Sequence, residues 1–326
     1  MNTPLSPALP AEAIDFDGVH CYVAGDGPPL LLVHSVNAAA SAAEVRPLFE
    51  RYRHSRRVFA LDLPGFGLSD RSEPTATRSY TPRLMTDALH ATLAQIQRQC
   101  GDVPVDALAA SLGCEFLARA AAEAPARFSR LAFVSPTGLQ GNTDLRQADG
   151  STREIGWLYT LLRQPLWAEW LFRQLTRPGV VRYFLQRTWG GKHIDETLWA
   201  YCVQSAHQPG ARHAPLRFLG RGLFSADIHR VYESLKQPVW MSHGVRGDFT
   251  DFRALSRLRL PQPWQRTVFA TGALPYFEAT EFGARFDDFL RSTRPGKLVS
   301  VPQLQPASSS PATSSATAGV GQPAWR

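Results

Sequence analysis

The segment from Val105 to Glu123 constrains the fold more than any other, because a short apolar run passes directly into a helical pattern at Ser111. Small residues flank this junction, Ala109 before it and Gly113 after it. A strand that turns sharply into a helix leaves the middle residue strained and exposed, and small neighbours keep the turn free of clashes. The helix directs its N–H groups and positive dipole end at the turn. We therefore predict that Ser111 is a nucleophile and that the Leu112 N–H stabilises an oxyanion.

Short apolar runs alternate with longer helical patterns along most of the chain. This alternation predicts a mostly parallel central sheet with helices on both faces. A hairpin is expected over residues 14–24, and the other runs expected as strands are residues 30–33, 57–61, 104–109, 131–134, 239–242 and 267–269. The strongest helical patterns cover residues 82–99, 112–123 and 278–290.

One block, residues 138–235, is helical throughout and has no good strand pattern. We interpret it as a helical cap inserted into a core formed by residues 13–137 and 236–294. The block contains five of the eight tryptophans, which are expected to pack the cap onto the core or to line an apolar pocket beneath it. These five are Trp157, Trp167, Trp170, Trp189 and Trp199.

The two ends have a different composition. Residues 1–12 are expected to be a disordered leader, and residues 295–326, rich in Ser, Pro, Ala, Thr and Gly, a disordered tail. The first residues lack the pattern of a signal peptide, and no apolar stretch is long enough for a transmembrane span. The expected location is the cytoplasm.

The formal net charge of +7 is scattered along the chain, so we expect no nucleic-acid partner. This scattered positive charge is consistent with a soluble protein and with loose contact with anionic lipid. The four cysteines form neither a C-x-x-C pair nor a zinc-type cluster with histidines, which predicts reduced thiols. No metal site and no phosphate-binding loop are evident, and we expect no cofactor.

Three further segments, read with the Ser111 turn, resemble the α/β-hydrolase superfamily. The resemblance covers about residues 28–292 and implies an α/β-hydrolase fold with a helical cap between core strands. The segments are Pro29-Leu30-Leu31-Leu32-Val33-His34-Ser35, Leu61-Asp62-Leu63-Pro64-Gly65-Phe66-Gly67-Leu68-Ser69-Asp70 and Val239-Trp240-Met241-Ser242-His243-Gly244.

The resemblance also implies roles for individual residues. Val36 supplies the second oxyanion N–H, although Ser35 stands where the family usually has glycine. The acid is expected soon after Gly244, at Asp248, with Asp251 in reserve. The alternative for Asp248 is a loop carboxylate that pairs with Arg246 or caps a helix.

The catalytic histidine is the main departure from the family. Its Gly-His-x-Pro-x-x-Glu segment corresponds to residues 272–278, where Gly272, Pro275 and Glu278 match but Ala273 replaces the histidine. No histidine follows His243. Loss of the base from a serine triad lowers the rate by roughly 10⁴–10⁶-fold.

A histidine from elsewhere is the obvious substitute. His207 in the cap is the candidate base, ahead of His213, His243 and His34. Tyr276 is a further candidate as a proton donor or ligand contact. The residues expected to border the pocket are His34, Ser35, Ala273 and Tyr276.

These features favour a serine hydrolase that acts on a small apolar ester, thioester or lactone with a non-standard base. Two alternatives remain open. One is a catalytically silent member that binds an apolar ligand or a partner; the other is a reaction that uses the oxyanion hole without acyl transfer. A haloalkane dehalogenase or an epoxide hydrolase is not expected, because both have aspartate at the position of Ser111.

Overall fold

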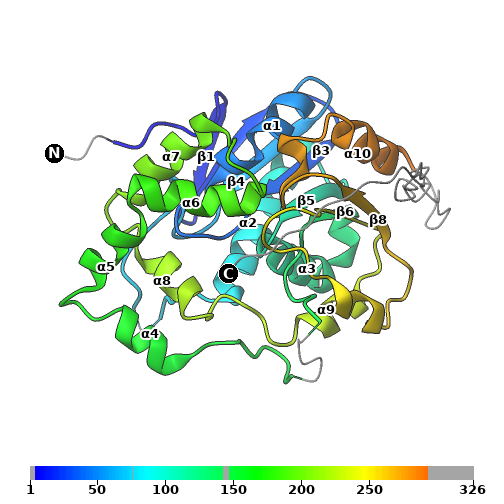
Figure 1. The fold of residues 1–326 in the computed structure, drawn as a ribbon. Helices are drawn as coiled ribbons and strands as arrows, with labels where there is room; N and C mark the ends of the chain where they lie inside the picture. Colours follow the sequence, from blue (N-terminus) through cyan, green and yellow to red (C-terminus); the bar gives the residue numbers. More distant parts are fainter. Residues whose placement is uncertain (1–3, 76, 142–146, 293–326) are drawn as a thin grey trace, which may run out of the picture. The chain divides into compact units, whose positions relative to one another are not determined.

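The computed structural model describes residues 4–75, 77–141 and 147–292. Within these ranges, eight strands form one sheet in the order β1-β2-β4-β3-β5-β6-β7-β8 (Figure 1). The β1–β2 and β2–β4 pairs are antiparallel, and every other pair is parallel. The expected hairpin and the mostly parallel sheet are thus confirmed. The strands are β1 (Glu12–Phe16), β2 (Val19–Ala24), β3 (Pro29–Val33), β4 (Arg57–Asp62), β5 (Val105–Ala110), β6 (Phe128–Val134), β7 (Val239–Gly244) and β8 (Gln265–Phe269).

Helices cover both faces of this sheet. Helices α1 (Arg46–Tyr52) and α10 (Phe282–Arg291) lie on one face, and α2 (Pro82–Cys100) and α3 (Gly113–Glu123) lie on the other (Figure 1). Successive side chains of a strand point to opposite faces, so β3 divides its residues between two apolar cores. Leu31 and Val33 join the core under α2 and α3, whereas Leu30 and Leu32 join the core under α1 and α10.

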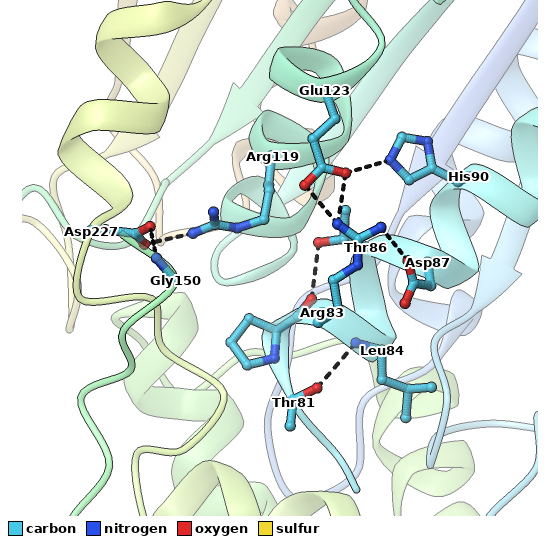
Figure 2. Close-up of polar contacts among 11 residues, drawn as sticks. Thr81, Arg83, Leu84, Thr86, Asp87, His90, Arg119, Glu123, Gly150 and Asp227 are labelled. Atoms are coloured by element: carbon cyan, nitrogen blue, oxygen red, sulfur yellow. Dashed lines mark hydrogen bonds and ion pairs between the residues drawn. The ribbon is translucent and has the colours of Figure 1, made fainter. Parts of the chain in front are cut away.

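Helix α2 begins where its sequence predicts. Thr81 is the N-cap and accepts a hydrogen bond from the Leu84 N–H at 3.1 Å, and Pro82 occupies the first helical position. Arg83 and His90 of this helix both contact Glu123 of α3, each at 2.8 Å (Figure 2). These exposed ion pairs join the two helices outside their apolar contact.

The described part of the leader is ordered, contrary to expectation. Leu9 is buried in the core under α1 and α10, and the Ala8 N–H donates to the Tyr22 hydroxyl at 2.8 Å. The burial of Leu9 and the hydrogen bond of Ala8 hold this short segment against the sheet. The tail that was expected to be disordered, residues 295–326, lies outside the described residues.

A run of helices lies between β6 and β7, in the segment that the sequence analysis assigns to the cap; that assignment stays a prediction. Its members are α4 (Gly156–Leu162), α5 (Ala168–Leu175), α6 (Pro178–Trp189), α7 (Glu196–Ala206), α8 (His213–Leu219) and α9 (Ile228–Ser234). None of the helices in the described ranges is long and apolar enough to cross a membrane.

Two buried acids tie the cap to α3, the helix that follows Ser111. Glu115 accepts from the Thr137 hydroxyl at 2.5 Å and from the Ser225 N–H at 2.8 Å, so it links the segment that enters the cap to the loop before α9. Asp227 is the second tie. It pairs with Arg119 at 2.6 Å and accepts from the Gly150 N–H at 2.7 Å (Figure 2).

The cap tryptophans do not share one environment. Trp189 is buried, and the Arg182 guanidinium lies over the Trp199 ring at 4.3 Å. The other three, Trp157, Trp167 and Trp170, are exposed. The expectation that the tryptophans pack the cap or line a pocket is therefore wrong for these three.

Candidate active site

Ser111 occupies the strained turn that the sequence predicts. It follows β5 directly with φ of +50°, and its N–H donates to the Val134 carbonyl at 2.8 Å. The left-handed region is unfavourable for a residue with a side chain, so the turn is strained. Gly113 makes the turn possible, because a Cβ there would lie 2.4 Å from the carbonyl oxygen of His34. The turn and the loop after β3 are thus in backbone contact.

The loop after β3 presents the second expected oxyanion donor. In the described part of the chain, neither the Val36 N–H nor the Leu112 N–H is paired with an acceptor. Glu44 braces this loop by accepting from the Ser35 N–H at 3.0 Å and from the Asn37 amide at 2.7 Å. Burial raises the pKa of the Glu44 carboxyl. Sequence reasoning missed Glu44 and Asn37, since neither belongs to a recognisable motif.

His34 has no free nitrogen for catalysis. Its Nε2 accepts from the Leu63 N–H at 2.9 Å, so its Nδ1 carries the proton and donates to the Ser35 carbonyl. Complete burial lowers the pKa of His34 to about 4. A neutral ring with both nitrogens in use supports the loop and is not a base.

The Ser111 hydroxyl has no hydrogen-bond partner among the described residues. His207 follows α7, is exposed, and contacts the Val203 carbonyl through Nδ1 at 2.6 Å. His243 is buried; its Nδ1 contacts the Gly244 carbonyl at 2.8 Å and its Nε2 accepts from Arg266 at 3.0 Å. The structure therefore does not bring either imidazole to the Ser111 oxygen.

His213 is the first residue of α8 and is half-buried. Burial lowers its pKa, and the charge of the adjacent Arg212 acts in the same direction. It also makes no hydrogen bond to Ser111 in the described structure.

Asp248 is engaged with the cap. Its two carboxylate oxygens accept from Arg187 of α6 at 2.7 and 2.8 Å, and its N–H donates to the Arg187 carbonyl at 3.1 Å. The hydrogen bonds from Arg187 lower the pKa of Asp248. A pairing with Arg246, the alternative from the sequence, is not formed, because Arg246 pairs with Glu278 at 2.7 Å.

The reserve acid, Asp251, is also occupied. It pairs with Arg253 at 2.9 Å and accepts from the Gly141 N–H at 3.0 Å. The hydrogen bonds from Arg253 lower its pKa.

The end of α6 also contacts the loop that carries Ala273. The Ala273 N–H donates to the Thr188 carbonyl at 2.8 Å, and its carbonyl accepts from the Ser135 hydroxyl at 2.6 Å. A Cβ on Gly272 would lie 2.5 Å from the Cα of Trp189, so the two backbones touch. The helix end therefore binds both loops in which the family carries its acid and histidine.

Tyr276 is buried, and its hydroxyl has no hydrogen-bond partner within the described residues. Burial raises its pKa, and the nearby Glu44 carboxylate acts in the same direction. His34, Ser35 and Ala273, the other expected pocket residues, are buried as well. The role of these four residues in a pocket stays a prediction.

No group of three or more His, Cys, Asp or Glu side chains in the described part of the chain has an arrangement that could hold a metal ion.

Comparisons with known proteins agree with this architecture. A family model described as the alpha/beta hydrolase fold matches residues 28–177. A 2-hydroxy-6-oxo-6-phenylhexa-2,4-dienoate hydrolase from Rhodococcus sp. strain RHA1 is 17% identical, with a TM-score of 0.62 over 84% of this chain and 95% of that chain. A serine hydrolase involved in carbazole degradation is 17% identical, with a TM-score of 0.65 over 86% and 97%.

The Cif epoxide hydrolase from Acinetobacter nosocomialis is 16% identical, with a TM-score of 0.62 over 86% of this chain and 88% of that chain. At such identities, these likenesses establish a shared fold.

Proposed function

Because the chain belongs to the α/β-hydrolase superfamily, we propose that it cleaves an apolar carboxylic ester, thioester or lactone slowly through Ser111. One observation carries the proposal. The strained serine turn is intact, with φ of +50°, and the N–H groups of Val36 and Leu112 are both unpaired in the described structure. Strain of this kind persists where the surrounding structure over-determines it, often at active sites.

The chemistry that this geometry supports is acyl transfer. The Ser111 oxygen attacks the carbonyl carbon, and the carbonyl electron pair moves to the oxygen, which accepts hydrogen bonds from Val36 and Leu112. Collapse expels the leaving group, which takes up a proton, and leaves an acyl ester on Ser111. Water then attacks this ester, releases the acid and restores the hydroxyl.

The base in this proposal comes from solution. The Ser111 hydroxyl has no side-chain partner among the described residues, so water or a small buffer base takes its proton. Such a serine is a poor nucleophile at neutral pH. We expect turnover roughly 10⁴–10⁶-fold below that of a complete triad. Deacylation requires the same base, so hydrolysis of the acyl ester is slow as well.

An apolar acyl group suits the surroundings of the turn. Val36 and Leu112 belong to one buried apolar cluster with Leu139, and cap residues Ala214 and Leu223 join the same cluster. In a series of aryl esters, we expect medium-chain acyl groups to react faster than acetyl. A series without any chain-length preference contradicts this substrate class.

The test is labelling by a fluorophosphonate probe, with and without added imidazole. Ser111→Ala should abolish labelling, whereas Ser79→Ala, which changes an exposed loop serine, should not affect it. Imidazole should accelerate labelling of the wild type, because it supplies the base that the site lacks. Rapid labelling that is insensitive to imidazole would refute a base from solution and point to one within the protein.

A second candidate function is binding without catalysis. The observation that favours it is the attachment of α6 to both triad loops, through Arg187 to Asp248 and through Thr188 to Ala273. A folded sample that does not label, even with imidazole, refutes the hydrolase proposal and favours this alternative. A ligand screen by thermal shift then identifies what is bound.

A further inference from the structure

We propose that the turn between α4 and α5 docks onto the surface of an anionic lipid bilayer. The docking surface, which we name the hairpin patch, is exposed and strongly apolar. It consists of Trp157, Leu161, Leu166, Trp167 and Trp170. This inference does not depend on the reaction proposed for Ser111.

The residues of the hairpin patch come from one short stretch of the chain, residues 157–170. Trp157 and Leu161 lie four residues apart on α4, on the same side of that helix. The Trp167 indole donates to the Leu161 carbonyl at 3.0 Å and joins the two helices at their turn. Leu166 lies in the turn, and Trp170 lies on α5. Figure 1 shows both helices at the outer edge of the cap, away from the sheet.

The exposure of this patch is unusual for a protein surface. Trp157 is 72% exposed, Leu166 88% and Trp170 63%. The inward face of α5 already packs against the rest of the protein through Ala168 and Phe172, which are buried. The exposed side chains are therefore additional to those that attach the cap. Large apolar side chains that are exposed close together in the chain indicate an interaction surface, and tryptophan favours the membrane–water interface.

The charge around the patch identifies the partner. Residues 156–193 contain five arginines, one lysine and a single acid, Glu169; acids outside this range pair with two of the arginines, Arg182 and Arg187. Glu169 is already paired with Arg173 and Arg212. Arg163 and Arg177 are exposed and have no ionic partner among the described residues. A surface that combines tryptophan and leucine with arginines that have no carboxylate partner complements anionic headgroups above an apolar layer.

A second copy of the chain fits this patch less well. A symmetric dimer would place the same patch on both sides of the interface. Arg163 and Arg177 of one copy would then face the same positive surface of the other. An anionic bilayer removes this repulsion and provides a counter-charge, so the charge pattern favours lipid.

The experiment is co-sedimentation of the full chain with vesicles. Vesicles of phosphatidylcholine with about 30% phosphatidylglycerol should bind it, and pure phosphatidylcholine vesicles should bind it much more weakly. The tryptophan emission should shift to the blue on binding. Raising the salt from about 0.1 M to about 1 M, which shortens the Debye length from about 10 Å to 3 Å, should release most of the protein.

Two variants separate the apolar and ionic parts of the surface. Leu166→Glu with Trp170→Glu should weaken the partition coefficient about tenfold or more, because the buried apolar area is lost. Arg163→Gln with Arg177→Gln should weaken it by about fivefold per arginine. The matched control is Val103→Glu, which adds a charge at a loop residue outside the cap that is 41% exposed. It should retain nearly all of the binding.

Three results overturn the proposal. The first is failure of the wild type to bind the anionic vesicles at low salt. The second is equal loss of binding in Val103→Glu and in the hairpin-patch variants, when circular dichroism shows that all are folded. The third is a dimer in light scattering that Leu166→Glu dissociates, which assigns the patch to a second copy.

Discussion

Glu115 should make the stability of this protein depend on pH near neutrality, and Glu115→Gln should remove that dependence. Glu115 is fully buried on α3, and burial raises its pKa from 4.5 to about 7. The Thr137 and Ser225 hydrogen bonds and the charge of Arg153 oppose this effect but do not cancel it. Glutamine keeps the shape and stays neutral at every pH.

The sign follows from proton binding. The folded state holds the Glu115 proton more tightly than the unfolded chain does, so this proton stabilises the fold fully below pH 4.5. The stabilisation is lost as the pH rises to about 7. A shift of this size corresponds to about 3 kcal/mol, with a slope of at most about 1.4 kcal/mol per pH unit.

The assay is urea unfolding of both proteins from about pH 4 to about pH 8, with the difference in unfolding free energy plotted against pH. The wild type should lose about 3 kcal/mol relative to the glutamine variant across this range. Thr137 can accept as well as donate, so it can still bond to the amide. Glu123→Gln, at an exposed ion pair on the same helix (Figure 2), is the control and should change stability by at most about 1 kcal/mol. Parallel curves for wild type and Glu115→Gln refute the reasoning.

Three further substitutions test the site and its support. Asp248→Asn should leave the rate of fluorophosphonate labelling at Ser111 unchanged, because its carboxylate is paired with the cap; a loss of about 100-fold or more would restore it as the catalytic acid. His207→Ala should also leave labelling unchanged, because this imidazole makes no hydrogen bond to the Ser111 oxygen; reduced labelling would make it the base. Gly67→Ala should destabilise the fold by about 3 kcal/mol or more in a thermal melt, since the new Cβ would lie 1.9 Å from the Asp62 carboxyl carbon at φ of +51°; an unchanged melting temperature would show that the loop relaxes.

The features that were predictable from the sequence are those that depend on neighbouring residues. The turn at Ser111 follows from an apolar run, a helix and the small residues Ala109 and Gly113, all within one short segment. The strands and the start of α2 likewise follow from local periodicity and from the Thr81 cap. Local patterns of this kind depend directly on backbone conformation, so the fold could be predicted from the sequence.

The partners of the catalytic loops were not predictable, because they come from far along the chain. Spacing after Gly244 identifies Asp248 as a loop carboxylate, but Arg187, which binds it, lies 61 residues earlier. Helical periodicity predicted helices between β6 and β7 but did not show which loops the ends of those helices contact. His207 illustrates this, since its position in the cap suggested a base. The exposed Trp157 shows the same limit: large apolar side chains are usually buried, and composition alone assigns them to a core.

The attachment of α6 to both triad loops has a consequence for redesign. A histidine at position 273 would enter a buried loop whose N–H is bonded to Thr188, and whose neighbour Gly272 touches the backbone of Trp189. The acid expected from the sequence, Asp248, is bound to Arg187. Installing a triad in this scaffold therefore requires a change of backbone conformation. Helix α6 and the loops that carry Asp248 and Ala273 have to be redesigned together. A library that varies only side chains at the site leaves these backbone contacts in place. A library that varies the length of the segment after Trp189 changes them.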